Sequence, residues 1–170
     1  MIDSEILASV RMVIFDFDGV FTDNTVSVSQ DGVESVQCWR SDGLGLSRLK
    51  EVGVKAFIIS TEANRVVSVR AAKLKVDCKQ NIEDKTVAIL ETCREVSILA
   101  KHTMFVGNDI NDIPGFEAVG FPVAVNDAYP EVNEHVLFRT QKKGGRGAVR
   151  EICDLIYFAK SSRSGVANSK

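Results

Sequence analysis

The sequence has few residues of the kinds that build zinc sites or disulfide frameworks. Its 170 residues include four cysteines and two histidines. The cysteines are widely separated and form no Cys-x-x-Cys pair, which argues against a zinc site. We expect these thiols to be reduced and to pack as small hydrophobic side chains.

The chain also lacks a strong charge of either sign and a long apolar run. Its formal net charge is -2 at pH 7, which gives no electrostatic reason to expect binding to nucleic acid or to an anionic membrane. It has no uninterrupted stretch of about 18 apolar residues. Residues 1–12 include acidic side chains and no apolar segment of signal-peptide length. We therefore expect a cytoplasmic protein.

The composition is that of an ordinary globular domain. Hydrophobic residues make up 45% of the chain and charged residues 26%. A chain of this length can bury about two-thirds of its unfolded surface around one core. We expect a single domain over residues 1–160 and a frayed, polar tail over residues 161–170.

Short apolar runs that end in polar residues alternate with stretches of helical spacing. Such runs are typical of buried parallel strands, and the alternation favours right-handed βαβ units in an α/β, Rossmann-like fold. The predicted strands cover residues 12–17, 56–60, 104–106 and 122–125. The predicted helices cover residues 44–51, 64–74, 85–100, 113–119 and 148–159.

Residues 24–38 interrupt this alternation between the first strand and the first helix. Here β-branched and polar residues alternate around Gln30-Asp31-Gly32, which is the pattern of a β-hairpin with an Asp-Gly turn. An exposed hairpin offers unpaired backbone groups to a neighbouring subunit. The insertion is therefore either an ordinary edge hairpin or an element of assembly.

Asp16 and Asp18 lie at the end of the first predicted strand. Ligands of open parallel sheets bind outside the carboxyl ends of the strands. Alternation along a strand sends Asp16 and Asp18 to the same side. Two carboxylates placed so close together require a cation or a shared proton, so this pair is the first candidate for catalysis.

Two further groups of candidates come from the second strand and from a helix start. Ser60, Thr61 and Glu62 precede a helix, where a hydroxyl and free backbone N–H groups can hold phosphate oxygens, although such residues are also common N-caps. Lys85 opens the helix over residues 85–100, where a cation is unfavourable. It requires a compensating anion, and its neighbours Glu83 and Asp84 are the candidates.

A fourth group, GNDIND, follows the strand over residues 104–106. Oxygen-rich side chains crowded into one turn suit Mg²⁺, which prefers carboxylates, carbonyls and water. The competing explanation is an isolated Asx turn. Because this loop ends a strand as the other groups do, we favour a magnesium site.

In this order, the segments FDFDGVFTD, IIST, Lys85 and GNDIND resemble the four motifs of the haloacid dehalogenase superfamily. The resemblance covers roughly residues 10–160. It implies a magnesium-dependent phosphatase in which Asp16 forms an aspartyl-phosphate and Asp18 acts as general acid and then as general base. It also implies that Ser60 and Lys85 bind the oxygens of the transferring phosphoryl group.

The same resemblance implies that Mg²⁺ is held by Asp16, by the carbonyl of Asp18 and by the GNDIND loop. Many relatives carry aspartate where this chain has Asn108. An amide oxygen can bind a hard cation, but the lost negative charge leads us to expect weaker metal binding. Asp109 or Asp112 is then expected to compensate.

Neither gap between the first motifs has room for a cap domain, so the chain resembles the capless subfamily that contains 3-deoxy-manno-octulosonate 8-phosphate phosphatases. That resemblance implies a homotetramer in which a neighbouring subunit completes each site. It also implies substrate contacts from Ser41, Asp42 and Gly43. Arg146, in the segment GGRG, is expected to bind a carboxylate or phosphate in bidentate fashion, the alternative being a solvated turn.

The Ser-Thr-Glu sequence and Lys73 resemble a branch that acts on nine-carbon, sialic-acid-type 2-keto-3-deoxy sugar acid 9-phosphates. By this resemblance Glu62 accepts bonds from sugar hydroxyls and Lys73 pairs with a carboxylate. Octulosonate 8-phosphate is the alternative substrate. A third interpretation, a non-catalytic oligomerisation module of an acylneuraminate cytidylyltransferase, is disfavoured by the intact Asp16, Asp18 and Lys85.

Overall fold

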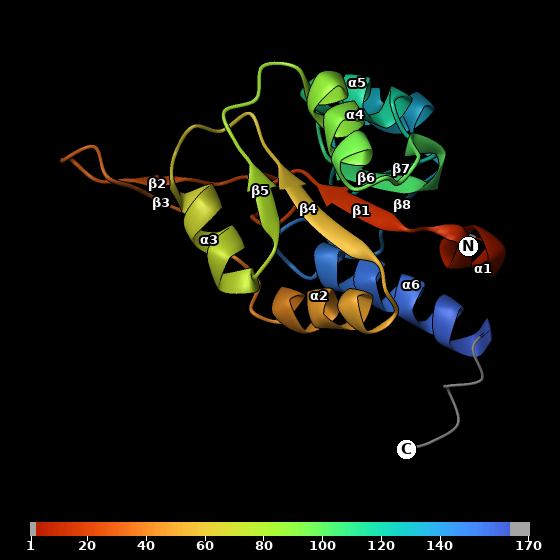
Figure 1. The fold of residues 1–170 in the computed structure, drawn as a ribbon. Helices are drawn as coiled ribbons and strands as arrows, with labels where there is room; N and C mark the ends of the chain where they lie inside the picture. The colour runs from red at the N-terminus through yellow and green to blue at the C-terminus, as the bar shows by residue number, and fades with distance from the viewer. Residues whose placement is uncertain (1–2, 164–170) are drawn as a thin grey trace.

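The fold is built on a six-stranded sheet, and the computed structural model describes residues 3–163. All strand pairs are parallel, and the strand order is β5-β4-β1-β6-β7-β8 (Figure 1). The predicted Rossmann-like α/β fold is therefore confirmed. The strands are β1 (Met12–Phe15), β4 (Lys55–Ile59), β5 (Asp77–Lys79), β6 (Thr103–Gly107), β7 (Phe121–Ala124) and β8 (Phe138–Arg139).

Helices cover both faces of the sheet (Figure 1). On one face lie α2 (Asp42–Glu51), α3 (Val66–Leu74) and α6 (Ala148–Arg163), and on the other lie α4 (Lys85–Glu95) and α5 (Ile113–Glu117). Within residues 3–163 no helix has the length and apolar character needed to cross a bilayer. The remaining helical segments are α1 (Ser4–Ser9), which packs on α6, and the short 3₁₀ turns Ala100–His102, Ile110–Asp112 and Pro130–His135.

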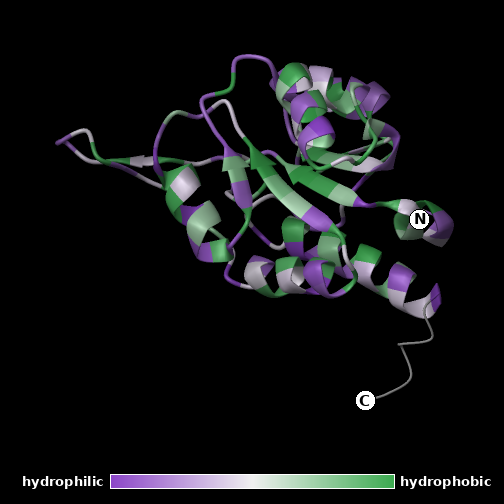
Figure 2. Ribbon diagram, in the orientation of Figure 1, coloured by the Kyte–Doolittle hydropathy of each residue, from purple (hydrophilic) through white to green (hydrophobic). Residues whose placement is uncertain are grey.

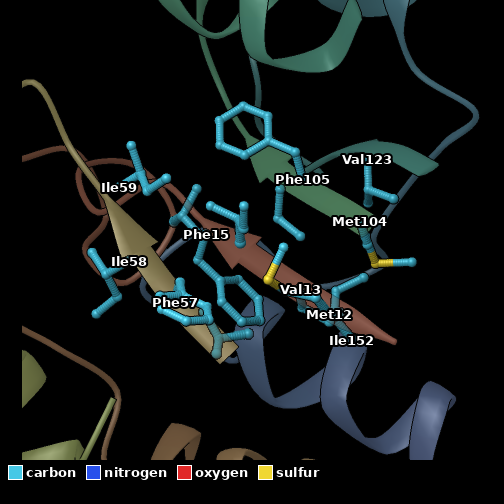
Figure 3. Packing of buried hydrophobic residues seen from close by; sticks show 14 of the residues in the cluster. Met12, Val13, Phe15, Phe57, Ile58, Ile59, Met104, Phe105, Val123 and Ile152 are labelled. Atoms are coloured by element: carbon cyan, nitrogen blue, oxygen red, sulfur yellow. The ribbon is translucent and has the colours of Figure 1, made fainter. Parts of the chain in front are cut away.

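The core lies between the sheet and these helices. Every residue of β1 is buried, because the strand is central and covered on both faces. Figure 2 shows the hydrophobic colouring concentrated on the central strands. Figure 3 shows Ile152 of α6 beside the side chains that β1, β4 and β6 contribute. Burial on both faces explains why these strands appear as continuous apolar runs in the sequence.

The predicted hairpin is present and projects away from the sheet (Figure 1). It consists of β2 (Ser27–Val28) and β3 (Glu34–Ser35), which pair antiparallel. In its turn Gly32 has a φ of +75° and its N–H donates to the Ser29 carbonyl at 2.9 Å, a conformation that glycine adopts without steric cost. Three hairpin valines are more than half exposed: Val26, Val28 and Val33.

One predicted helix ends earlier than its apolar pattern indicates. The spacing predicts a helix over residues 85–100, but α4 ends at Glu95. Ser97 has a φ of +56°, a left-handed conformation that cannot continue a right-handed helix. Ile98 then turns back into the core, and its N–H donates to the Cys93 carbonyl at 3.0 Å. The apolar residues after Glu95 therefore pack as a helix-terminating turn.

The last helix is longer than predicted. It extends through Arg163, and Ser161 on its last turn is buried. The expected frayed tail therefore does not begin at residue 161. The rest of that predicted tail, residues 164–170, lies outside the described part of the chain.

The strand order reverses beside β1. The chain passes from β1 to β4 and β5 on one side, and then crosses to β6, β7 and β8 on the other. Loops that follow β1, β4 and β6 diverge from one another at this point. Ligands of such sheets bind in the crevice at the carboxyl ends of these strands. We therefore expect the active site among the loops that carry the predicted motifs.

Candidate active site

Lys85 joins the loops that follow β1 and β6. Asp16 follows β1, and its Oδ2 atom lies 3.0 Å from Nζ of Lys85, the first residue of α4. Lys85 also forms an ion pair with Asp112, which ends the loop after β6. All three residues are buried. A single cation therefore holds two carboxylates from separate loops at the strand ends.

Burial and the neighbouring charges shift the pKa values of both Asp16 and Lys85. Burial raises the pKa of Asp16 to about 7, the Asp112 carboxylate adds to the rise, and Lys85 opposes it. Burial acts to lower the pKa of Lys85, but the carboxylates of Asp16 and Asp112 outweigh this effect and its pKa is raised. Lys85 thus keeps its proton and provides a fixed positive charge beside Asp16.

The anions that compensate Lys85 differ from those expected. The sequence pointed to Glu83 or Asp84, whereas the partners are Asp16 and Asp112. Asp84 instead caps α4, because its carboxylate accepts the N–H of Val87 at 3.0 Å. The local prediction was wrong because the sheet brings distant carboxylates closer to the lysine than its own neighbours.

Asp112 also holds the GNDIND loop in shape. Its Oδ2 atom accepts the backbone N–H of Asn108 at 2.7 Å and of Asp109 at 3.2 Å, while Oδ1 accepts from Lys85. The Asp109 carboxylate accepts the N–H of Ile110 at 2.7 Å. Both acidic side chains proposed as additional metal ligands thus accept hydrogen bonds within the loop.

Asn108 lies against Gly19, next to the peptide bond of Asp18. A methyl group on Gly19 would lie 2.1 Å from Nδ2 and 2.8 Å from Oδ1 of Asn108, so only glycine leaves room for this amide. The φ of Gly19 is +75°, which also favours glycine. Asn108 is itself almost completely buried. The structure therefore positions an amide beside the main chain of the Asp16–Gly19 loop.

These residues fit a magnesium ion. The Asp16 carboxylate, the Asp18 carbonyl and the Asn108 amide are hard oxygen donors, and Mg²⁺ retains water or phosphate oxygens at its other positions. Within residues 3–163 no group of three or more His, Cys, Asp or Glu side chains is arranged to hold a metal. The donor set named above contains one carboxylate, with one amide and one main-chain oxygen.

Asp18 is half-buried and has a hydrogen-bonding neighbour. The Thr22 hydroxyl lies 3.4 Å from Asp18 Oδ1, and the same hydroxyl oxygen accepts the N–H of Gly19 at 3.1 Å. Burial raises the pKa of Asp18, and the Glu62 carboxylate raises it further, while Thr22 opposes the rise. A carboxyl group with a raised pKa is suited to donating a proton near neutral pH.

The loop after β4 is ordered by side chains that cap its own backbone. Ser60 is buried, and its Oγ accepts the N–H of Glu62 at 3.1 Å. The Glu62 carboxylate in turn accepts the N–H of Asn64 at 2.7 Å. Thr61 is exposed. Ser60 is not the N-cap of the next helix, because that position of α3 is Arg65. The Ser60 hydroxyl still has a proton to donate, as a phosphate-binding role requires.

Of the predicted substrate residues Ser41, Asp42 and Gly43, the structure buries Asp42 completely and leaves the other two partly exposed. Asp42 has no exposed surface, and neither carboxylate oxygen has a hydrogen-bond partner among the described residues. Gly43 faces Leu74 at the end of α3. Direct contact between Asp42 and a substrate, as the resemblance implied, is therefore not possible in this structure.

Of the two cationic residues predicted to bind substrate, Lys73 and Arg146, only Arg146 lies near the crevice. Lys73 is exposed in the last turn of α3, far along that helix from the loop after β4. Arg146 is about half exposed, and its Nη2 atom lies 2.8 Å from Asp23 Oδ2. The Arg146 loop packs on the Asp16–Asp23 loop, because Gly145 N–H donates to the Val20 carbonyl at 2.9 Å. Arg146 is thus near the crevice, and Lys73 is not.

A cavity of about 270 Å³ lies beside Asp18, between the hairpin and the loop after β4. The Asn64 side chain donates to Glu34 Oε2 at 2.9 Å and so joins β3 to this loop. Sequence reasoning missed Glu34 and Asn64, since neither belongs to a motif. The cavity is lined by Asp18, Asn24, Thr25, Val26, Glu34, Val36, Glu62, Asn64 and Val66.

The sequence profile of the haloacid dehalogenase-like hydrolase family matches residues 51–152. The chain belongs to this family. The matched range includes Ser60, Lys85 and the GNDIND loop. Phosphatases of the family use a divalent metal.

The chain is similar to known phosphatases over nearly its whole length. The 3-deoxy-D-manno-octulosonate 8-phosphate phosphatase KdsC of Salmonella typhi is 33% identical over 153 residues, which are 89% of this chain and 81% of that protein. The structure of the phosphatase of this name from Yersinia pestis is 32% identical with a TM-score of 0.90, over 95% of this chain and 88% of that one.

A third relative carries ligands. The structure of this phosphatase from Moraxella catarrhalis, in complex with magnesium, phosphate and KDO, is 28% identical with a TM-score of 0.89, over 95% of this chain and 94% of that one. Family membership and these relatives confirm that the chain is a phosphatase. The interpretation as a non-catalytic module is set aside.

Proposed function

We propose that this chain is a magnesium-dependent phosphatase of 3-deoxy-D-manno-octulosonate 8-phosphate, with Asp16 as the nucleophile. The observation that carries the proposal is the buried contact of Asp16 with Lys85 at the switch point of the sheet. Similarity to octulosonate 8-phosphate phosphatases over 89% and 95% of this chain supports the eight-carbon substrate. The nine-carbon substrate, expected from the Ser-Thr-Glu sequence, has no such support.

The proposed reaction has two steps. A carboxylate oxygen of Asp16 attacks phosphorus, the bond from phosphorus to the sugar oxygen breaks, and Asp18 gives its proton to that oxygen. Asp18 then removes a proton from water, the water oxygen attacks phosphorus, and the bond to Asp16 breaks to release phosphate. Lys85 and the Ser60 hydroxyl bind the equatorial oxygens, on which negative charge gathers during transfer.

The metal is proposed to be held by the Asp16 carboxylate, the Asp18 carbonyl and the Asn108 amide. When bound, it supplies positive charge to the phosphoryl oxygens and favours the ionised form of Asp16. Asp112 acts as a positioning residue, because it fixes both Lys85 and the backbone of Asn108. In this scheme the protein contributes one carboxylate to the metal where many relatives contribute two.

Recognition of the sugar acid is proposed to involve the loop of Arg146 and a second subunit. Arg146 is about half exposed, so it can exchange its contact with Asp23 for an anionic group of the substrate. The exposed valines of the hairpin support the proposed homotetramer, in which a neighbour covers the open crevice. A solution mass equal to one chain would contradict the shared site.

The substrate assignment is tested by phosphate release with Mg²⁺ from octulosonate 8-phosphate and from nine-carbon nonulosonate 9-phosphates. We expect the eight-carbon ester to have the higher kcat/KM, and Asp16→Asn to release no phosphate from either. A preference for the nine-carbon ester would overturn the substrate assignment alone. No release from any ester, with Asp16→Asn indistinguishable from the unaltered protein, would overturn the proposed enzyme.

A further inference from the structure

The cavity beside Asp18 has a strongly acidic lining. Three carboxylates border it, from Asp18, Glu34 and Glu62, and among its described lining residues none is basic. Within residues 3–163 neither Glu34 nor Glu62 takes part in an ion pair. Two glutamates thus add uncompensated negative charge to a space that opens directly onto the proposed acid of the reaction.

Asn64 fixes the positions of both glutamates. Its side-chain amide donates to Glu34 Oε2 at 2.9 Å, and its backbone N–H donates to Glu62 Oε1 at 2.7 Å. Glu34 comes from the hairpin and Glu62 from the loop after β4, so one residue joins the two walls of the cavity. Each glutamate retains a second oxygen that can accept a hydrogen bond.

A loop with three cationic residues lies on the opposite side of β1. The loop over residues 142–146 follows β8, and it carries Lys142, Lys143 and Arg146. It packs on the Asp16–Asp23 loop through the contact of Gly145 with Val20. Strand order places β8 beyond β6, whereas the acidic cavity adjoins the loop of β4. The loop over residues 142–146 therefore lies on the β8 side of β1, and the acidic cavity lies on the β4 side.

We propose that the cavity lined by Asp18, Glu34 and Glu62 receives the part of the leaving group next to the ester, and that Glu34 and Glu62 select hydroxyl groups there and reject a carboxylate. Ionised carboxylates only accept hydrogen bonds, so hydroxyl donors suit them and a third anion is repelled. This inference rests on the proposed function. It requires the carboxylate of a sugar acid substrate to lie remote from the phosphoester.

Two small phosphate esters test the proposed selection of a hydroxyl group over a carboxylate. Glycerol 3-phosphate and 3-phosphoglycerate share three carbons and differ in a hydroxymethyl group against a carboxylate. With Mg²⁺ we expect kcat/KM to favour glycerol 3-phosphate by about tenfold or more, since one unit charge at contact distance changes affinity by this order. The preference should weaken at high ionic strength, because salt screens exposed charges.

Glu34→Gln is the decisive variant, because the amide oxygen can still accept from Asn64 while the charge is removed. In this variant we expect the ratio of kcat/KM for glycerol 3-phosphate to that for 3-phosphoglycerate to fall by about fivefold. Glu91→Gln, at an exposed position on α4, is the matched control and should leave the preference unchanged. Thermal melting followed by circular dichroism checks that both variants fold as the unaltered protein does.

Two results would overturn the inference while leaving the phosphatase intact: equal kcat/KM for the two esters, or a Glu34→Gln preference equal to that of Glu91→Gln. Failure of the proposed function is separate, since no ester would then be hydrolysed. The dissociation constants of the same two phosphates, measured by calorimetry, would in that case still test the acidic cavity. Equal dissociation constants for glycerol 3-phosphate and 3-phosphoglycerate would contradict the proposed role of the acidic cavity.

Discussion

Lys85 Nζ lies 3.0 Å from Asp16 Oδ2 and also forms an ion pair with Asp112. The proposed nucleophile and the anchor of the GNDIND loop therefore share one buried cation. Removing one member of a buried ionic group leaves an uncompensated charge, which is costly in a region with little water. In this protein the residues proposed for catalysis are consequently also part of what holds the strand-end loops together.

We predict that Lys85→Met lowers both stability and activity. The variant leaves Asp16 and Asp112 buried without their cation, so the free energy of unfolding should fall by about 3–5 kcal/mol. Phosphate release should fall by at least about 10²-fold, because the phosphoryl oxygens lose a positioned positive charge. Urea denaturation and a phosphate-release assay measure the two effects.

The double variant Lys85→Met/Asp112→Asn separates the two effects. It removes one of the two unpaired carboxylates, so part of the lost unfolding free energy should return while phosphate release stays low. Equal stability of Lys85→Met and the unaltered protein would show that the buried ion pairs contribute nothing. Recovery of activity in the double variant would show that Lys85 has no direct role in transfer.

We predict that Asn108→Asp strengthens magnesium binding. The change adds one negative charge beside Asp16 and the Asp18 carbonyl, so the dissociation constant for Mg²⁺ should fall by about tenfold. Calorimetric titration with MgCl₂ measures this without reference to turnover. Asn111→Asp, an exposed position in the same loop, is the control. Equal gains in the two variants would indicate a general charge effect and would exclude Asn108 as a ligand.

We predict that Asp42 makes stability decrease as the pH rises from about 4 to about 7. Burial raises the pKa of Asp42 to about 7, while Arg70 and Arg150 oppose the rise. Between the unfolded and folded pKa values the folded state binds more protons, so its stability is greatest at the acid end and falls with pH, by up to about 4 kcal/mol.

Asp42→Asn should remove this part of the pH dependence. Urea denaturation of both proteins from pH 5 to pH 8 gives the comparison, and the variant should become the more stable protein toward pH 8. Other buried carboxyl groups contribute equally to both curves and cancel in the difference. Parallel curves for the two proteins would show that Asp42 is already ionised in the folded state at pH 5.

The strands were predictable because burial on both faces leaves continuous apolar runs. Strand β1 begins at Met12, as predicted, and β4, β6 and β7 begin one residue before their predicted starts. The segments α1, β5 and β8 were not predicted, since six, three and two residues carry too little periodicity. The end of α4 depends on the left-handed Ser97, which has no sequence signal comparable to glycine.

The motif residues of the site were predictable, but their partners were not. Lys85 and Asp112 are 27 residues apart in the chain, and Glu34 and Asn64 are 30 apart. Only the packing of the sheet and the hairpin brings them together. The sequence also cannot show which oxygens of an acidic loop are already engaged by backbone N–H groups. For that reason Asp112 was predicted as a possible metal ligand, whereas the structure uses it to hold Lys85 and the loop.

Asp16 is the residue proposed to carry the phosphoryl group during turnover. The direct measurement is mass spectrometry of peptides from the protein quenched in acid during turnover of octulosonate 8-phosphate with Mg²⁺. We predict one phosphoryl group on the peptide that contains Asp16, and none in Asp16→Asn. Phosphate release by Asp16→Asn at the rate of the unaltered protein, with no phosphorylated peptide in either, would contradict the account.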